Sequence, residues 1–85
     1  MNKISLKTYL NKPILCDVEL TYQQWVKLFY SMHIYDKQEF FSQLNNYSVV
    51  EINYNTSLLC LVNYQNKNNV ISLKKCYKIS NLNFI

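Results

Sequence analysis

The chain has no glycine and no arginine among its 85 residues. A loop that cradles phosphate needs glycine, because only glycine lets backbone N–H groups approach the phosphate in strained conformations. Walker A loops, dinucleotide-binding fingerprints, EF-hands and nucleophile elbows are therefore excluded. Without arginine there is also no planar fork to hold a carboxylate or phosphate by two parallel hydrogen bonds. Any contact with an anion must come from lysine or from backbone amides.

Long apolar runs are also missing. The longest extends from Leu58 to Val62, which is far too short to span a membrane. The N-terminus lacks the apolar segment of a secretory signal. We therefore expect a soluble cytoplasmic protein with no membrane partner, located in the host cytoplasm if the chain is viral.

Cysteine is scarce, with Cys16, Cys60 and Cys76 alone. An odd number of cysteines without a secretory signal argues against a disulfide framework, so we expect free thiols. A zinc site built from these cysteines and His33 is disfavoured, because the spacing is long and contains no CxxC pair.

Asparagine, lysine and tyrosine are abundant instead, with 12 Asn, nine Lys and eight Tyr. The codons for Asn, Lys, Ile and Tyr are rich in A and T, so this composition indicates an AT-rich genome. Apolar residues make up 49% of the chain and aromatic residues 15%, which is typical of a folded chain rather than a disordered one. The length predicts one small domain over residues 1–85.

Charge is distributed unevenly along the chain. Residues 1–16 carry three lysines and no acid, and residues 17–51 carry five acids and two lysines. Residues 52–85 carry four lysines and no acid. The net charge of +4 therefore arises from two basic ends around an acidic middle.

The N-terminal part predicts extended structure. Residues 14–20 alternate between apolar positions and positions that are mostly polar, the pattern of a half-buried strand. The inward-facing positions are predicted to be Ile14, Cys16, Val18 and Leu20. Residues 3–11 suit either a strand or a short helix, and Pro13 ends either one.

Two helices are predicted next. Thr21 and Gln24 form a capping box, and Leu20 before it can staple against Trp25. This helix extends to about His33. At helical spacing it carries an apolar stripe that consists of Trp25, Leu28, Phe29 and Met32.

The second helix is predicted to begin at Asp36, where Glu39 completes the same capping pattern and Tyr35 can staple against Phe40. Asn45 and Asn46 are expected to end it, because asparagine tolerates a left-handed conformation.

The remaining chain predicts an antiparallel meander of strands 49–54, 57–64 and 70–79, with turns at Asn55 and at residues 66–69. The middle strand is apolar on both faces, which predicts a central position. The expected fold is therefore α+β, with an N-terminal strand, two helices and a three-stranded meander, and with the helices packed on the small antiparallel sheet. The tail 80–85 either docks through its apolar residues or stays loose.

No group of residues predicts catalysis. A catalytic thiol needs an electropositive, accessible setting, whereas Cys16 and Cys60 fall on apolar strand positions. Catalytic carboxylates need environments that push their pKa values apart, and the acids here have capping or solvent-facing positions. We therefore expect a protein that is not an enzyme and that has no metal and no cofactor.

The basic C-terminal half carries the best nucleic-acid pattern. Lysines can neutralise phosphates and tyrosine rings can stack on bases. Arginine to bind guanine edges is missing, however, and so is the RNP signature of RNA-binding sheets. The alternative function is therefore a small basic nucleic-acid-binding protein, ribosome- or transcription-associated. Its contacts, to nucleic acid or to an acidic partner, would be Lys67, Lys74, Lys75, Lys78 and Tyr77, with Tyr64 nearby.

The first helix carries the best protein-binding pattern. Tyr22, Val26 and Tyr30 widen its apolar arc beyond what packing on a sheet requires, and tyrosine is favoured at interfaces. Either the second helix, a protein partner or a second copy in a homodimer would cover them. The leading hypothesis is a small non-catalytic protein-binding module. Small proteins of this composition include viral and mobile-element inhibitors of host machinery or host defence, so we expect an inhibitor of anti-CRISPR-like kind.

Overall fold

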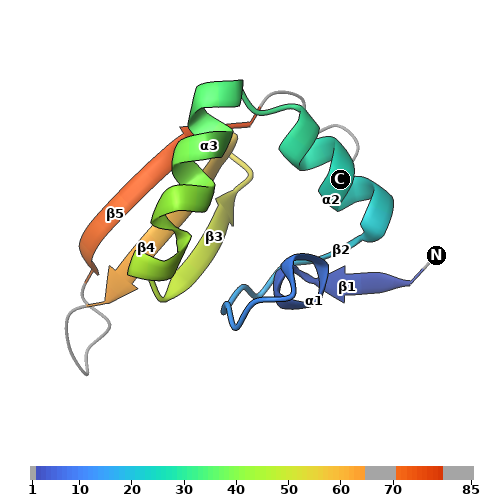
Figure 1. Cartoon of the computed structure of the whole chain (residues 1–85), viewed down its shortest axis with the longest axis horizontal. Helices are drawn as coiled ribbons and strands as arrows, with labels where there is room; N and C mark the ends of the chain where they lie inside the picture. Colours follow the sequence, from blue (N-terminus) through green and yellow to red (C-terminus); the bar gives the residue numbers. More distant parts are fainter. Residues whose placement is uncertain (1, 65–70, 80–85) are drawn as a thin grey trace.

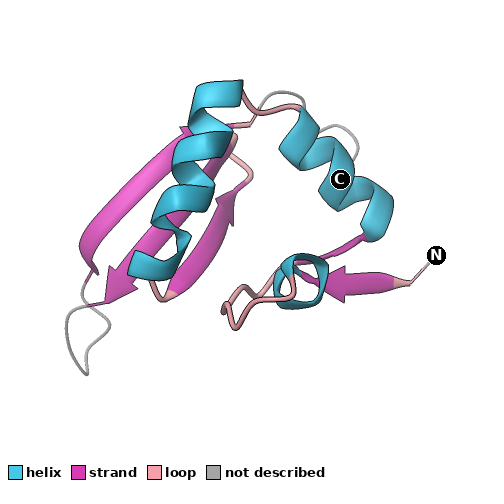
Figure 2. Cartoon of the chain, in the orientation of Figure 1, coloured by secondary structure: helices cyan, strands magenta, loops and turns pink. Residues whose placement is uncertain are grey.

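In the computed structural model of the chain, the fold is mixed α+β, which confirms the predicted class (Figure 1). The structure describes residues 2–64 and 71–79. An antiparallel pair of strands at the N-terminus is followed by two main helices and a three-stranded antiparallel meander (Figure 2). The predicted turn at residues 66–69, Lys67 and the tail 80–85 lie outside the described residues.

Residues 3–11, which suit either a strand or a short helix, contain both: a strand followed by a short helix. Strand β1 (Lys3–Ser5) pairs antiparallel with β2 (Glu19–Thr21), and helix α1 (Leu6–Leu10) begins directly after β1. The Ser5 hydroxyl caps α1 by accepting a hydrogen bond from the Thr8 amide at 3.1 Å. Asn11, left-handed at φ 54°, ends the helix before Pro13.

The strand predicted over residues 14–20 is only partly right. Burial alternates along it as expected, but only its last residues belong to β2. Leu15 makes an isolated parallel bridge to Val49, and the Val50 amide donates to the Leu15 carbonyl at 2.8 Å. The segment crosses from the meander to β1, so it pairs with the meander only at Leu15 and joins a ladder with β1 only at Glu19 and Leu20.

Helix α2 (Tyr22–Tyr30) begins at the predicted capping box. The Thr21 hydroxyl accepts from the Gln24 amide at 3.1 Å, and the Gln24 side chain accepts from the Thr21 amide at 2.9 Å. Two backbone donors that would otherwise lack partners are thereby satisfied.

The predicted start of the second helix is wrong. Helix α3 (Ile34–Gln43) begins at His33, whose Nδ1 accepts from the Tyr35 amide at 3.3 Å. Asp36 lies in the first turn, where its charge suits the positive end of the helix dipole. A 3-10 turn, η1 (Leu44–Asn46), follows α3. Neither predicted asparagine there is left-handed, because the helix continues into this turn.

The meander consists of β3 (Val49–Asn53), β4 (Leu58–Tyr64) and β5 (Ile71–Lys78), in that spatial order. The central position of β4 is confirmed, and both of its faces are buried. Leu59 and Leu61 lie on the face that contacts the helices, and Cys60 and Val62 lie on the opposite face. All four are buried. Between β3 and β4 the turn contains Asn55, as predicted, with left-handed Ser57 at its end.

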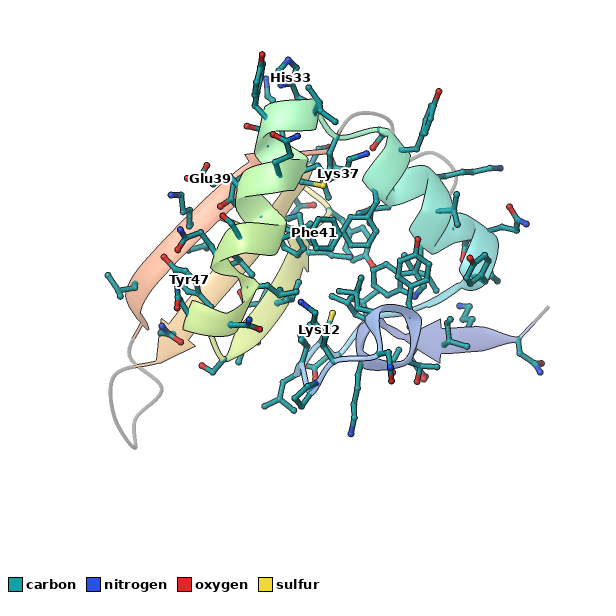
Figure 3. The ribbon with its side chains drawn as sticks, in the orientation of Figure 1. Lys12, His33, Lys37, Glu39, Phe41 and Tyr47 are labelled. Carbon is teal, nitrogen blue, oxygen red and sulfur yellow. A yellow bond between two sulfur atoms is a disulfide. The ribbon has the colours of Figure 1, made fainter. Side chains whose placement is uncertain are left out.

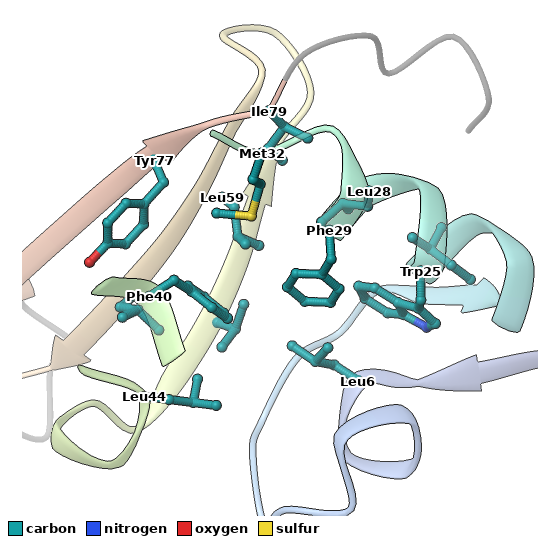
Figure 4. Packing of buried hydrophobic residues seen from close by; sticks show 13 residues of the cluster. Leu6, Trp25, Leu28, Phe29, Met32, Phe40, Leu44, Leu59, Tyr77 and Ile79 are labelled. Carbon is teal, nitrogen blue, oxygen red and sulfur yellow. The ribbon is translucent and has the colours of Figure 1, made fainter. Parts of the chain in front are cut away.

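The core lies between the helices and one face of the meander (Figure 4). All four residues of the predicted stripe are buried in it. The predicted end of the helix near His33 is wrong, because α2 ends at Tyr30 and Met32 follows it. Phe40 of α3 packs edge-on against Tyr77 of β5, with ring centroids 5.9 Å apart. The Trp25 indole N–H donates to the Ile4 carbonyl at 2.9 Å, which ties α2 to β1.

None of the helices in the described part of the chain combines the length and the apolar composition that crossing a lipid bilayer requires.

Candidate protein-binding surface

Helix α2 has aromatic residues on two sides. Trp25, Leu28 and Phe29 face the core and are buried. On the other side, Tyr30 is 85% exposed and Tyr22 is 59% exposed, while Val26 between them is half-buried. The second helix therefore does not cover the predicted protein-binding residues.

Tyr22 is exposed but held in place. Its ring lies 5.3 Å from the ring of Tyr9 in α1. Tyr9 in turn stacks on Phe29, with centroids 5.7 Å apart and ring planes 6° apart. Burial raises the pKa of Tyr9, and the neighbouring Tyr22 adds to the effect. A row of aromatic rings therefore connects the surface to the core.

The corner between α2 and α3 adds two apolar side chains that sequence reasoning did not place at the surface. Tyr35, predicted to staple against Phe40, is 73% exposed, and Ile34 is 52% exposed. His33 lies at this end of α3 (Figure 3), and its ring is 5.3 Å from the ring of Tyr35. We use the name tyrosine face for the three α2 residues and the two exposed residues at the start of α3, namely Tyr22, Val26, Tyr30, Ile34 and Tyr35.

A groove lies beside the corner. Its volume is about 400 Å³. Residues from the corner, from the β3–β4 turn and from the end of β5 line it: Ser31, His33, Asp36, Ser57, Lys78 and Ile79. Both signs of charge and two hydroxyls therefore lie next to the exposed aromatic rings.

The residues of the predicted nucleic-acid set do not share one surface. Lys74 and Lys78 are exposed on the sheet face that looks away from the helices. Lys75 faces the helices, where it forms a salt bridge with Glu39 that raises the lysine pKa. Lys67 and the side chain of Tyr64 lie outside what the structure describes.

Tyr77 has to be removed from that set. Only 4% of its side chain is exposed, because its ring packs under Phe40, so it cannot stack on a base. Its hydroxyl is buried and has no hydrogen-bond partner among the described residues. Burial raises the pKa of this phenol, and the Glu39 carboxylate raises it further.

The expectation of three free thiols is also wrong. Cys60 and Cys76 are joined by a disulfide between directly opposite positions of β4 and β5, and Cys16 is the free cysteine. Mainly because of burial, the pKa of Cys16 is raised, which lowers its thiolate fraction. Within residues 2–64 and 71–79, no three metal-ligating side chains come together.

Compared with known proteins, the chain matches no protein-family model, no curated protein and no solved structure.

Proposed function

We propose that the chain is a small non-catalytic protein-binding module that contacts its partner through the tyrosine face. The supporting observation is the exposure of Tyr30 and Tyr35, which flank the corner between α2 and α3. Folding gains nothing from leaving these large apolar rings in water. A partner that buries them would recover that free energy.

Tyrosine suits this role for a physical reason. Its ring offers a large contact area with few rotatable bonds, and its hydroxyl still needs a hydrogen-bond partner when buried. Energetically important residues at interfaces are enriched in tyrosine and lie in well-packed, desolvated centres. Tyr22 is already held by Tyr9, so less side-chain freedom is lost when it binds.

The chemistry of the surface supports a partner of one kind. Between Tyr22 and Tyr30, α2 carries one charge, that of Lys27, and no acid. The partner should therefore offer an apolar concavity with hydrogen-bond acceptors for the phenol groups. The AT-rich composition and the small size favour a viral or mobile-element inhibitor of host machinery or host defence as the biological form of this module.

Site-specific photo-crosslinking tests the proposal. Tyr30 or Tyr35 is replaced by p-benzoylphenylalanine, and the protein is irradiated in a lysate of a candidate host. We expect both positions to crosslink to the same protein. The matched control places the same group at Tyr54, an exposed tyrosine in the β3–β4 turn. Equal crosslinking from Tyr54, or none from Tyr30 and Tyr35, would contradict the assignment of the surface.

Other occupants have distinct outcomes. Crosslinking of the chain to itself, together with a concentration-dependent dimer in sedimentation, would replace the partner by a second copy. Fluorescence anisotropy with labelled DNA and RNA at about 50 and 200 mM salt would detect phosphate-driven binding, which weakens steeply over that range. Binding that weakens steeply with salt and that is lost in the Lys74→Gln/Lys78→Gln variant would favour the nucleic-acid alternative.

A further inference from the structure

The two sulfurs of the Cys60–Cys76 disulfide lie in unequal surroundings. Cys60 is on the central strand β4 and is 1% exposed. Cys76 is exposed and belongs to β5, which lies at the edge of the sheet (Figure 1). No strand in the described part of the chain pairs with the outer edge of β5. The bond is therefore open to solvent from one side.

A single row of residues crosses the outer face of the meander. Glu51 of β3 lies opposite Cys60, and Cys60 lies opposite Cys76. Side chains two residues apart on a strand share a face. Lys74 and Lys78 therefore flank Cys76 on this face, and both are exposed. The row has a carboxylate at its β3 end and two ammonium groups at its β5 end.

This row gives the disulfide a direction of attack. In thiol–disulfide exchange a thiolate attacks one sulfur, and the other sulfur leaves. The thiolate must approach along the S–S axis, from the side opposite the leaving sulfur. Cys76 can be approached from the open edge of β5, past two lysines. An approach to Cys60 would come over β3, where Cys60 is only 1% exposed.

We propose that Cys76 is a site of thiol–disulfide exchange with small anionic thiols such as glutathione. The thiolate forms a new S–S bond with Cys76 Sγ, the Cys60–Cys76 bond breaks, and its electron pair leaves on Cys60 Sγ, which takes up a proton. Cys60 lies on the central strand and is 1% exposed, so a small thiol reaches it less readily than it reaches Cys76. The first adduct is therefore the mixed disulfide on Cys76.

A second thiol completes the reduction. It attacks the small-thiol sulfur of the mixed disulfide and releases the Cys76 thiolate, so the two small thiols supply the two electrons and leave as their own disulfide. Lys74 and Lys78 stabilise the anionic reactant in the first step and the leaving thiolate in the second. The state of Cys76 would thus follow the thiol pool around the protein.

Mass spectrometry locates the first adduct. The oxidised protein, in a Cys16→Ser background that prevents reshuffling, is exposed briefly to reduced glutathione and quenched in acid. We expect glutathione on Cys76 and a Cys60 thiol that is alkylated only after denaturation. An adduct on Cys60, equal adducts on both, or three free thiols in the wild-type protein after mild oxidation would overturn the proposal.

The role of the lysines needs a charge comparison. Rates with anionic glutathione and with cationic cysteamine are compared at equal thiolate concentration. We expect glutathione to react at least about threefold faster, with the preference weakened by salt and lost in Lys74→Gln/Lys78→Gln. The matched control, Lys7→Gln/Lys27→Gln, removes two exposed lysines from the helices and should keep the preference. An equal loss in both variants, or none in the first, would exclude steering by these lysines.

Discussion

The aromatic residues on the two sides of α2 differ in whether packing in the core accounts for them. The helix has nine residues, and its inner side is fully accounted for by folding, since Trp25, Leu28 and Phe29 fill the core. Its outer side is equally aromatic, yet Tyr22 and Tyr30 remain in contact with water. Apolar residues that periodicity assigns to one helix therefore divide into a buried group and an exposed group, and the proposed function assigns the exposed group to partner binding. Stability should depend on the inner side and partner binding on the outer side.

The largest effect on stability is expected from Leu28→Ala. Leu28 is fully buried and belongs to the hydrophobic core, and removal of its side chain leaves a cavity in a small core. We expect the free energy of unfolding to fall by about 2–5 kcal/mol. Urea titration followed by the fluorescence of Trp25, the only tryptophan of the chain, measures this change.

Leu28→Met serves as the control for that experiment. It keeps most of the volume and should cost less than about 1.5 kcal/mol. A loss in Leu28→Ala no larger than in Leu28→Met would mean that the inner side is loosely packed, and the contrast between the two sides would disappear.

The starts of α2 and α3 can be predicted from the sequence only where the capping interaction joins residues a few positions apart. The Thr21–Gln24 capping box joins groups three residues apart, so the sequence alone predicts it. The same pattern at Asp36 and Glu39 was misleading, because His33 caps α3 instead. Residue preferences at helix starts favour Asp over His. They do not take into account that the connection between α2 and α3 is short, so that α3 already begins after His33. That error also hid Tyr35, which was assigned to a staple that exists only if the helix begins at Asp36.

The disulfide could have been predicted from geometry rather than from the number of cysteines. Cys60 and Cys76 each lie eight residues from Asn68, within the predicted turn. A hairpin that turns there places them opposite one another, as the observed register does. The odd number of cysteines bears on the redox compartment of the protein, whereas the pairing of Cys60 with Cys76 is decided by the register of β4 and β5. The outer-side tyrosines, in contrast, were correctly identified as exceeding what the core needs.

A smaller effect is expected from Tyr22→Ala. Tyr22 is on the outer side, but its ring contacts Tyr9, and such aromatic pairs contribute roughly 0.5–1.5 kcal/mol beyond their buried area. We expect a loss of about 1 kcal/mol in a urea titration. Tyr22→Phe keeps the ring and should retain most of that stability.

A double-mutant cycle sharpens this prediction. Tyr9→Leu and Tyr22→Ala should show a coupling energy of about 0.5 kcal/mol or more, as contacting residues do. Additive effects would show that Tyr22 is as free as Tyr30 and that no row of rings joins the surface to the core.

The smallest effect on stability is expected from Tyr30→Ala, because this ring is the most exposed of the large apolar side chains described. The free energy of unfolding should change by no more than about 0.5 kcal/mol.

The effects on partner binding should have the opposite order to the effects on stability. If Tyr30 lies in the centre of the interface, its truncation should weaken binding by about 2 kcal/mol, or roughly 30-fold, whereas Leu28→Met should leave the affinity unchanged. Isothermal titration with the crosslinked partner, once identified, measures both. An affinity that follows stability across these variants, rather than opposing it, would mean that the partner senses only whether the chain is folded.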